Sequence, residues 1–444
     1  MKIVFIVPAA KLMRSFVYRW GAKIYGQKNN ITGPLILGTI LKKAGHEVEV
    51  YEELYQDVDY QSLEADIYGI YTMSSNSIRG YEIADFLKKE MGKRVIIGGM
   101  HASARPEEAA CHADQVVVGE AESVIKDVVE GKINEKIIQA KPLQNLDSIP
   151  FPDYSLLKTP TDAANVLTTR GCPNQCSFCT TSRMFAPYRR RSIDSVIEEL
   201  RSYKNAGFEY INFQDDNFTA DSNRVKALLK RMINENLVFK ETFFFGRKDF
   251  LEDEDEELLE LMERSNLNRV LIGFESFKQE SLDKINKKQK VADVNKLKEH
   301  AEKLSEHKIK ILASLVLGVD TDSKEDMRKS VQVCKDINAY QLQPAILTPF
   351  PGTLDYKNFE QEGRIITKQW NLYDMIHAVF KPANMSPAEL EEEAFRAFKN
   401  FYDFKGALKM RKLFGKKEGL MRLVFALAGI IPMPLYKYFH KKTS

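Results

Sequence analysis

Residues 170–179 read Arg-Gly-Cys-Pro-Asn-Gln-Cys-Ser-Phe-Cys and contain three of the five cysteines of this 444-residue chain. The three are Cys172, Cys176 and Cys179. Cys111 and Cys334 stand alone, and we interpret them as small buried hydrophobic residues. A disulfide framework spreads its cysteines along a short secreted chain and usually has an even number of them. The clustering therefore predicts a metal centre in a reducing compartment.

Three closely spaced thiolates suit a [4Fe–4S] cluster in which one iron lacks a cysteine, whereas an ordinary ferredoxin cluster has four. The amine and carboxylate of an amino acid could chelate this free iron, and S-adenosylmethionine (SAM) carries both groups. One electron given to the sulfonium would then cleave a carbon–sulfur bond and yield a 5′-deoxyadenosyl radical. The alternative is a zinc site or buried free thiols. Zinc usually takes four N/S ligands, and no second Cys/His pair stands near, although His101 and His112 exist.

Strand and helix patterns alternate on the C-terminal side of the motif. The expected strands are 165–169, 209–213, 242–246, 269–274, 310–317 and 341–347, and the expected helices are 193–205, 223–235, 255–264, 291–306 and 324–336. Six such units predict a partial (β/α)6 version of the TIM barrel, whose chemistry lies at the C-terminal ends of its strands. The cysteine motif directly follows the first of these strands.

The first third of the chain also alternates. Strands are expected at 2–7, 47–51, 66–72, 94–98 and 115–119, with helices at 33–44, 81–90 and 120–130. This predicts a parallel sheet covered on both faces, which binds ligands at the carboxyl ends of its strands. The loops expected there are Ser74–Ser77, Gly98–Ser103 and Gly119–Glu122, and their small residues let a ligand approach the backbone. Candidate cofactor contacts are Ser74, Ser75, Gly98, Gly99 and Gly119.

The rest of the chain consists of a linker and a helical tail. Four prolines interrupt residues 139–163, and after Trp370 the pattern is helical, with a capping box at Ser386-Pro-Ala-Glu389. We therefore expect a first domain at 1–138, a linker at 139–163, a barrel at 164–365 and a helical region at 366–444.

The tail combines an apolar run with basic residues. Leu423–Met433 is too short to span a bilayer, and six basic residues lie between Lys405 and Lys417, with further lysines at 437, 441 and 442. This composition suits an anionic membrane surface. The alternative is a C-terminal helix that packs on the barrel and leaves its lysines in water.

Composition narrows the class of protein. Hydrophobic residues make up 44% and charged residues 29% of the chain, and the net charge is +3. This balance is ordinary for a globular protein and argues against a nucleic-acid partner bound through bulk charge. The first residues lack a signal-peptide cleavage pattern, so we expect a cytoplasmic protein, with possible peripheral contact at the inner face of the membrane.

The spacing Cys-x3-Cys-x2-Cys, with an aromatic residue before the third cysteine, resembles the signature of radical SAM enzymes. The resemblance implies that Phe178 lies beside the SAM adenine. It extends to the later strand ends, where Asp215 and Asp216 replace the common Gly-Gly-Glu near the SAM amino group. By the same resemblance Arg247 would face the SAM carboxylate, Glu275 the ribose and Gly318 the adenine. These three residues directly follow the third, fourth and fifth predicted barrel strands, respectively.

The first domain resembles that of the cobalamin-binding radical SAM enzymes. The matching motifs are Gly98-Gly-Met-His101-Ala-Ser103, Val118-Gly119-Glu120-Ala-Glu122 and Pro150-Phe-Pro-Asp-Tyr154. The resemblance implies a Rossmann-like domain with cobalamin between the two domains, and it adds His101 and Glu120 to the candidate contacts. The Asp-x-His-x-x-Gly motif that supplies a cobalt ligand in many cobalamin proteins is absent, so we do not assign His101 as that ligand.

The leading hypothesis is a cobalamin-dependent radical SAM C-methyltransferase that acts on an unactivated carbon of a small-molecule or lipid substrate. Its cofactors would be the [4Fe–4S] cluster, SAM and cobalamin, with a one-electron reductant such as flavodoxin or ferredoxin. The first alternative is a ring-closing or oxidative radical SAM enzyme. The second is a lipid- or cobalamin-binding protein with a structural cluster. A methylthiotransferase is rejected because it needs three further cysteines in the first domain, where only Cys111 occurs.

Overall fold

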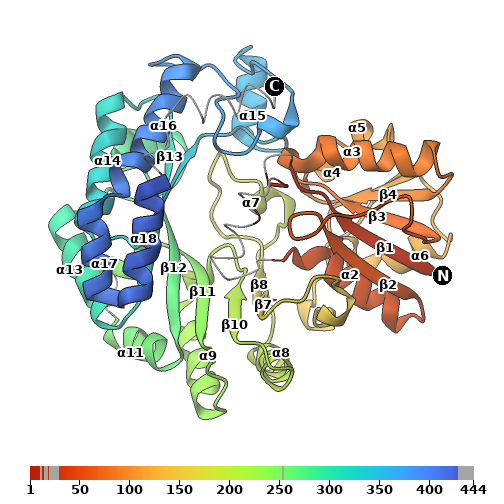
Figure 1. The fold of residues 1–444 in the computed structure, drawn as a ribbon, viewed down its shortest axis with the longest axis horizontal. Helices are drawn as coiled ribbons and strands as arrows, with labels where there is room; N and C mark the ends of the chain where they lie inside the picture. Colours follow the sequence, from red (N-terminus) through yellow and green to blue (C-terminus); the bar gives the residue numbers. More distant parts are fainter. Residues whose placement is uncertain (11–12, 15–18, 20–29, 253–254, 429–444) are drawn as a thin grey trace.

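The computed structural model describes residues 1–10, 13–14, 19, 30–252 and 255–428. Figure 1 shows two parallel sheets side by side, followed by a helical C-terminal region that lies against the second sheet. Each sheet has six strands. This is the mixed α/β architecture that the alternating patterns predict.

The first sheet has the strand order β2-β1-β3-β4-β5-β6. Its strands are β1 (Lys2–Val7), β2 (Glu47–Glu52), β3 (Ile67–Tyr71), β4 (Arg94–Gly98), β5 (Gln115–Val118) and β6 (Ile137–Gln139), and all neighbouring pairs are parallel. The order reverses at β1, and ligands bind in such sheets beside the reversal, outside the carboxyl ends of the strands.

Alternate side chains of these strands build two separate cores. Ile3 and Phe5 face the helices α2 (Thr32–Lys43) and α6 (Ile125–Val129). Val4 and Ile6 face the opposite layer. That layer contains α3 (Ser74–Lys89), α4 (Met100–Ala104) and α5 (Pro106–Ala110).

The second sheet runs β7-β10-β11-β12-β13-β14 in sequence order, as an open barrel requires. Its strands are β7 (Ala163–Val166), β10 (Tyr210–Phe213), β11 (Glu241–Arg247), β12 (Leu267–Glu275), β13 (Lys310–Leu317) and β14 (Gln341–Ile346). The helices that cover it are α8 (Ile193–Asn205), α9 (Ser222–Asn234), α11 (Glu256–Arg264), α13 (Val294–Glu306), α14 (Lys324–Asp336) and α15 (Leu354–Gln361). One continuous core joins these helices to the strands.

Several element boundaries differ from the sequence-based expectation. Helix α6 spans only Ile125–Val129 of the expected helix 120–130, and α4 begins at Met100, inside the expected Gly98–Ser103 loop. Helix α3 begins at Ser74, so the expected Ser74–Ser77 loop is its first turn. Strand β6 was not expected, because three residues are too short for a periodic signal. Strand β7 ends at Val166, and Thr169–Arg170 instead forms a short antiparallel pair, β8, with β9 (Arg189–Arg190).

The helical C-terminal region contains α16 (Pro387–Phe401), α17 (Phe404–Phe414) and α18 (Lys416–Ala428). The expected capping box is present, since the Ser386 hydroxyl accepts from the Glu389 amide and the Glu389 carboxylate accepts from the Ser386 amide. The second half of the apolar run Leu423–Met433, and the lysines at 437, 441 and 442, lie outside the described residues. Among the described residues, no helix is both long and apolar enough to cross a bilayer.

Candidate functional site

A cavity of about 240 Å³ lies where the carboxyl ends of the two sheets meet. From the first sheet it is lined by residues at the ends of β3, β4 and β5, among them Tyr71, Gly98 and Gly119. From the barrel it is lined by Leu167 after β7, and by Gln214 and Asp216 after β10. Both sets of strands therefore present their ligand-binding edges to one space.

Glycines keep the sheet side of this cavity open. A Cβ on Gly69 would lie 2.5 Å from the Phe5 ring, so a larger residue there would displace that ring into the cavity. A Cβ on Gly98 would meet only the Val117 carbonyl oxygen, at 3.7 Å, and its free side borders the cavity. Gly99 has φ +101°, and a Cβ there would lie 2.6 Å from the Thr72 carbonyl oxygen, so glycine is required.

The cysteine motif lies in a loop, residues 171–179, which we call the cluster loop. Gly171 begins it with φ +81°, and a Cβ there would lie 2.5 Å from the Phe185 carbonyl oxygen. The Ser177 amide donates to the Ile285 carbonyl at 3.0 Å, and the Ser177 carbonyl accepts from the Leu354 amide at 3.1 Å. Segments that follow β12 and β14 thus hold the loop from two sides.

The three cysteines differ in exposure and partners. Cys176 is buried, and Cys172 and Cys179 are partly exposed. Burial raises the pKa of the Cys176 and Cys179 thiols, although amide and hydroxyl groups of Thr181 act in the opposite direction on Cys179. Ligation by iron would compensate for this burial, because a coordinated thiol is held as the thiolate.

The donor set fits a cubane cluster better than a single ion. Among the described residues, no group of three or more His, Cys, Asp or Glu side chains is arranged to hold one metal ion. A cubane does not need such convergence, because each cysteine ligates a different iron. Asn174 Nδ2 lies 3.5 Å from Cys172 Sγ, a contact of the kind that tunes a ligating sulfur. Of the two isolated cysteines, Cys334 is buried as expected, but Cys111 is exposed, so its interpretation as a buried residue is wrong.

The two adjacent carboxylates after β10 have different environments. Asp215 is fully buried, and it accepts from the Thr168 amide at 3.1 Å and from the Thr168 hydroxyl at 2.7 Å. Thr169 donates its hydroxyl to the same carboxylate. These bonds fix the chain between β7 and the cluster loop. Asp216 instead faces the cavity, and desolvation by the surrounding protein raises its pKa to about 6.

The ends of β11 and β12 carry a connected polar group beside the cluster loop. Glu275 has φ +62° and forms a buried ion pair with Lys287, with 2.5 Å between Oε1 and Nζ. Arg247 donates to the Lys287 carbonyl at 2.9 Å and to Asp249 at 3.0 Å. A non-glycine residue with positive φ at a strand end is held there by its surroundings. Lys287 and Asp249 were not expected from the sequence, since nothing in the spacing relates them to the cysteine motif.

Glu120 joins the first sheet to the cluster loop. Its carboxylate is buried and accepts from Arg170 at 2.9 Å and from Arg189 through two nitrogens. Arg170 also pairs with Glu122 at 2.8 Å. Because Arg170 precedes Cys172 by two residues, the loop after β5 holds the start of the cluster loop. Glu120, Glu122 and Arg170 all line the cavity.

Several expected contacts lie elsewhere in the structure. Ser74 and Ser75, in the first turn of α3, are not among the residues that line the cavity. His101 is buried behind them, where its Nδ1 lies 3.0 Å from the Ser74 hydroxyl and its ring contacts Trp370 edge-on. A Cβ on Gly318 would lie 2.4 Å from a methyl group of Leu390, so this glycine permits close packing of α16.

Phe178 packs partly buried against the barrel core.

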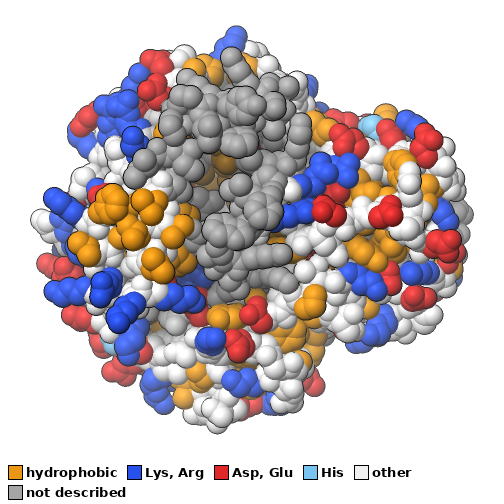
Figure 2. All heavy atoms as spheres, viewed as in Figure 1, with side chains coloured by type: hydrophobic (Ala, Val, Ile, Leu, Met, Phe, Trp, Pro, Cys, Tyr) orange, Lys and Arg blue, Asp and Glu red, His pale blue; other side chains and the backbone are white. Residues whose placement is uncertain are grey.

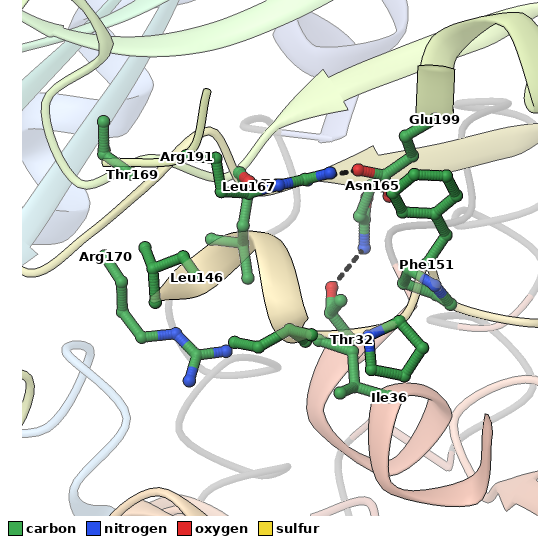
Figure 3. Close-up of a pocket in the computed structure, with 13 residues that line it drawn as sticks. Thr32, Ile36, Leu146, Phe151, Asn165, Leu167, Thr169, Arg170, Arg191 and Glu199 are labelled. Atoms are coloured by element: carbon green, nitrogen blue, oxygen red, sulfur yellow. Dashed lines mark hydrogen bonds and ion pairs between the residues drawn. The ribbon is translucent and has the colours of Figure 1, made fainter. Parts of the chain in front are cut away.

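A smaller pocket of about 30 Å³ adjoins the cavity and shares Ile36, Leu167 and Arg170 with it. Figure 3 shows that it is enclosed by helix α2, the linker and the start of the barrel. Asn165 donates to the Thr32 hydroxyl at 3.2 Å across it, and Arg191 pairs with Glu199 at its far wall. The linker is therefore a packed part of the junction between the sheets.

Comparison with known proteins agrees with this geometry. Residues 166–334 match the model of the radical SAM superfamily. The chain is 28% identical to bacteriochlorophyllide d C-8(2)-methyltransferase of Chlorobaculum tepidum, over 88% of this chain and 89% of that protein. It is 29% identical to bacteriochlorophyllide d C-12(1)-methyltransferase of the same organism, over 79% and 77%. The fold is also similar to the solved structure of OxsB, a cobalamin-dependent SAM radical enzyme, with aqua-cobalamin and SAM bound. The superposition has a TM-score of 0.68 and 12% sequence identity, and it covers 100% of this chain and 71% of the OxsB chain.

The fold and the cysteine motif agree with the superfamily match: residues 166–334 form a radical SAM domain, of the kind that uses a [4Fe–4S] cluster and SAM. The two named sequence relatives are methyltransferases, and the fold of the chain is similar to that of OxsB.

Proposed function

We propose that this protein is a cobalamin-dependent radical SAM C-methyltransferase that acts on an unactivated carbon of a hydrophobic substrate. The observation that supports it most is the cavity of about 240 Å³ between the ligand-binding edges of the two sheets, which Arg170, the residue before the cluster loop, helps to line. A cluster held by that loop would supply the electron that cleaves SAM to a hydrogen-abstracting radical, and cobalamin bound in the cavity would supply the methyl group.

The residues of the chain would divide these tasks between the two sheets. Cys172, Cys176 and Cys179 would ligate the cluster. Gly98 and Gly119, at strand ends that line the cavity, would admit the cobalamin nucleotide tail. No histidine is among the described residues that line the cavity, so the chain offers no imidazole to cobalt from that wall.

SAM would bind in the barrel beside the cluster loop. Arg247 and Glu275 are buried at the ends of β11 and β12, and Asp216 faces the cavity after β10. We propose that Asp216, rather than the fully bonded Asp215, contacts the SAM amino group. The buried pair of Glu275 and Lys287 would hold the ribose side of the site in position.

The hydrophobic substrate is proposed from the C-terminal hairpin of α17 and α18. Exposed apolar side chains form a stripe on each helix, which we call the hairpin patch: Phe404, Leu408, Leu420, Val424 and Leu427. Figure 2 shows apolar side chains gathered over these two helices, with basic side chains around them. Leu408 and Leu420 are 68% and 62% exposed, which is unusual for leucines on helices that also pack on a core.

Basic residues surround the hairpin patch. Six exposed cations lie on the same two helices: Lys405, Lys409, Arg411, Lys412, Lys416 and Lys417. The opposite face is anchored, because the buried Arg422 donates to the carbonyls of Ala339, Tyr340 and Phe401. A basic amphipathic surface on a rigid support suits an anionic membrane face. We propose peripheral binding there, where a lipid or isoprenoid substrate would be reached.

Product analysis tests the proposed reaction. Anaerobically reconstituted protein is given cobalamin, a reductant, SAM with a labelled methyl group and a lipid extract. Methylation consumes one SAM to 5′-deoxyadenosine and a second to S-adenosylhomocysteine, so both products should form in about equal amounts, as the two half-reactions require. The Cys176→Ala variant should form no 5′-deoxyadenosine. Formation of 5′-deoxyadenosine without S-adenosylhomocysteine would instead support the ring-closing or oxidative alternative.

A further inference from the structure

A basic segment lies directly against the cluster loop. It comprises residues 284–290, Lys-Ile-Asn-Lys-Lys-Gln-Lys, and begins at the last residue of α12 (Gln279–Lys284). Two hydrogen bonds join it to the loop. The Ile285 carbonyl accepts from the Ser177 amide at 3.0 Å, and Asn286 Nδ2 donates to the Gln175 carbonyl at 2.6 Å. The segment thus contacts the loop on both sides of Cys176, the second cysteine.

The backbone of this segment turns its residues alternately inward and outward. Asn286 and Lys288 have φ angles of 51° and 52°, a left-handed conformation that is uncommon without glycine. Lys287 points inward to Glu275, and the buried Gln289 donates to Asp249 at 2.8 Å. Lys288 and Lys290 are exposed, and neither has an ion-pair partner among the described residues.

Other exposed groups extend the same surface. Pro173 and Gln175 bring the cluster loop itself to the surface. Arg183 is exposed on α7 (Thr181–Met184), just after the third cysteine. Lys284 is 55% exposed and lies 3.9 Å from Asp320, a distance that leaves it only weakly paired. The acidic residue just before the segment, Asp283, accepts from Gln279 at 2.9 Å.

We propose that Lys284, Lys288, Lys290 and Arg183 form the docking surface for an acidic one-electron donor protein that carries a flavin or an iron–sulfur centre. The inference rests on the proposed function, because reductive cleavage of SAM needs such a donor. One electron passes from the donor to the cluster for each SAM that is cleaved, and the donor is oxidised by one electron.

Charge and position both favour this partner. Lys288 and Lys290 point away from the barrel interior, where SAM and substrate would lie, so a bound small molecule would not reach them. Electron-transfer encounters use small interfaces, and opposite charge speeds their formation. A donor seated on this surface would approach the cluster loop at its exposed residues, Pro173 and Gln175.

Binding of an acidic flavodoxin tests the docking surface. The probe is oxidised flavodoxin titrated against the cluster-loaded chain at low and at physiological salt. Reversing two charges with Lys288→Glu and Lys290→Glu should weaken binding about tenfold at low salt, as loss of complementary charge does. The matched control reverses Lys43, at the end of α2, and Lys308, before β13, both exposed. It should change the dissociation constant by less than about twofold, because charges far from an interface contribute little to binding.

A second measurement separates docking from the chemistry. With dithionite as reductant, the double variant should form 5′-deoxyadenosine at the wild-type rate. With reduced flavodoxin it should be slower. Unchanged flavodoxin binding by the double variant would overturn the proposal. A matching loss of dithionite-driven cleavage would also overturn it, because the lysines would then act on the SAM site. Failure to transfer a methyl group while flavodoxin still binds would reject the proposed function and leave the docking surface standing.

Discussion

Buried charges hold the residues around the cluster loop in place. Glu120 has a side chain that is 1% exposed and two arginine partners, Arg170 and Arg189. A carboxylate buried with two guanidinium groups is stable only while the charges compensate each other, because the cost of desolvating each ion is large. Glu120 therefore ties the loop after β5 to both strands of the β8–β9 pair.

The Glu120→Gln substitution keeps the side-chain shape but removes the charge. We expect a loss of roughly 3 kcal/mol in the free energy of unfolding, the cost of leaving the buried Arg189 without a carboxylate partner. Denaturant unfolding of the cluster-free chain measures it. Glu122→Gln is the control, because Glu122 pairs with Arg170 alone and its loss leaves the Glu120 pairs intact. An equal loss in both variants would show that Glu120 has no special role at this junction.

The sequence predicted the residues of the cluster loop but not the partners that position them. The cysteine spacing identified the loop, since the three thiols are close in sequence. The partner of Asp215, Thr168, lies 47 residues before it, and Arg189 lies 69 residues after Glu120. Such pairs depend on how the two sheets meet, which no local pattern contains. For the same reason His101, in a glycine-rich motif, could be named from the sequence but not placed behind the sheet edge.

At the scale of elements, side-chain caps determine where several helices begin. Ser323 and Asp326 form a capping box at the start of α14, where the Asp326 carboxylate accepts from the Ser323 amide at 3.0 Å. Lys278 donates to the same carboxylate at 3.0 Å. Hydrogen bonding from Ser323 and the charge of Lys278 lower the pKa of Asp326 from 3.8 to about 2.

This shift predicts how the stability of the α14 cap depends on pH. Because the pKa of Asp326 is lower in the folded chain than in the unfolded chain, its contribution is complete above pH 4 and is lost as the pH falls toward 2. Asp326→Asn should cost about 1 kcal/mol at pH 7, as loss of a charged helix cap does. Chemical denaturation of the wild type and the variant, from pH 7 down toward pH 2, measures this difference in stability. A difference between the two proteins that does not shrink below pH 4 would contradict this assignment.

Element boundaries were predictable where hydrophobic periodicity was strong. The strands β1, β4 and β13 have the predicted bounds, because each is a continuous run of apolar residues. The start of α3 was misplaced because Ser-Ser-Asn-Ser has the composition of a loop. In the structure Asn76 caps that turn, accepting from the Met73 amide at 2.8 Å and donating to the Pro8 carbonyl at 2.9 Å. The tertiary contact with Pro8 decided the boundary.

At the scale of the whole molecule, the proposed function assigns two surfaces to different partners. The cavity lies between the sheets, whereas the hairpin patch lies on the far side of the barrel from the first sheet (Figures 1 and 2). The hairpin is joined to the barrel by Arg422 and by the pair of Lys310 and Glu418, at 3.0 Å. Membrane binding through the hairpin patch would therefore orient the entire enzyme.

Vesicle sedimentation tests that orientation. The full chain should co-sediment with phosphatidylglycerol vesicles and less with phosphatidylcholine vesicles, because each basic residue near an anionic surface contributes about 1 kcal/mol before screening. Replacing Leu408 and Leu420 with serine should release the chain, and replacing Ile366, which is 44% exposed outside the hairpin, should not. Equal sedimentation of all three proteins would leave α17 and α18 as packing helices and remove the support for a lipid substrate.

The central claim is that the cavity between the two sheets holds cobalamin beside the cluster loop. The direct measurement is the corrinoid absorption of anaerobic protein after incubation with hydroxocobalamin and gel filtration. We predict about one cobalamin per chain for the wild type, as a single preformed pocket requires, and little or none for Gly98→Phe, whose ring would enter the cavity. The iron content of both proteins should be equal, since the cluster loop is unchanged. Wild-type protein that emerges with its iron but without cobalamin, or a Gly98→Phe variant that retains it fully, would contradict the account.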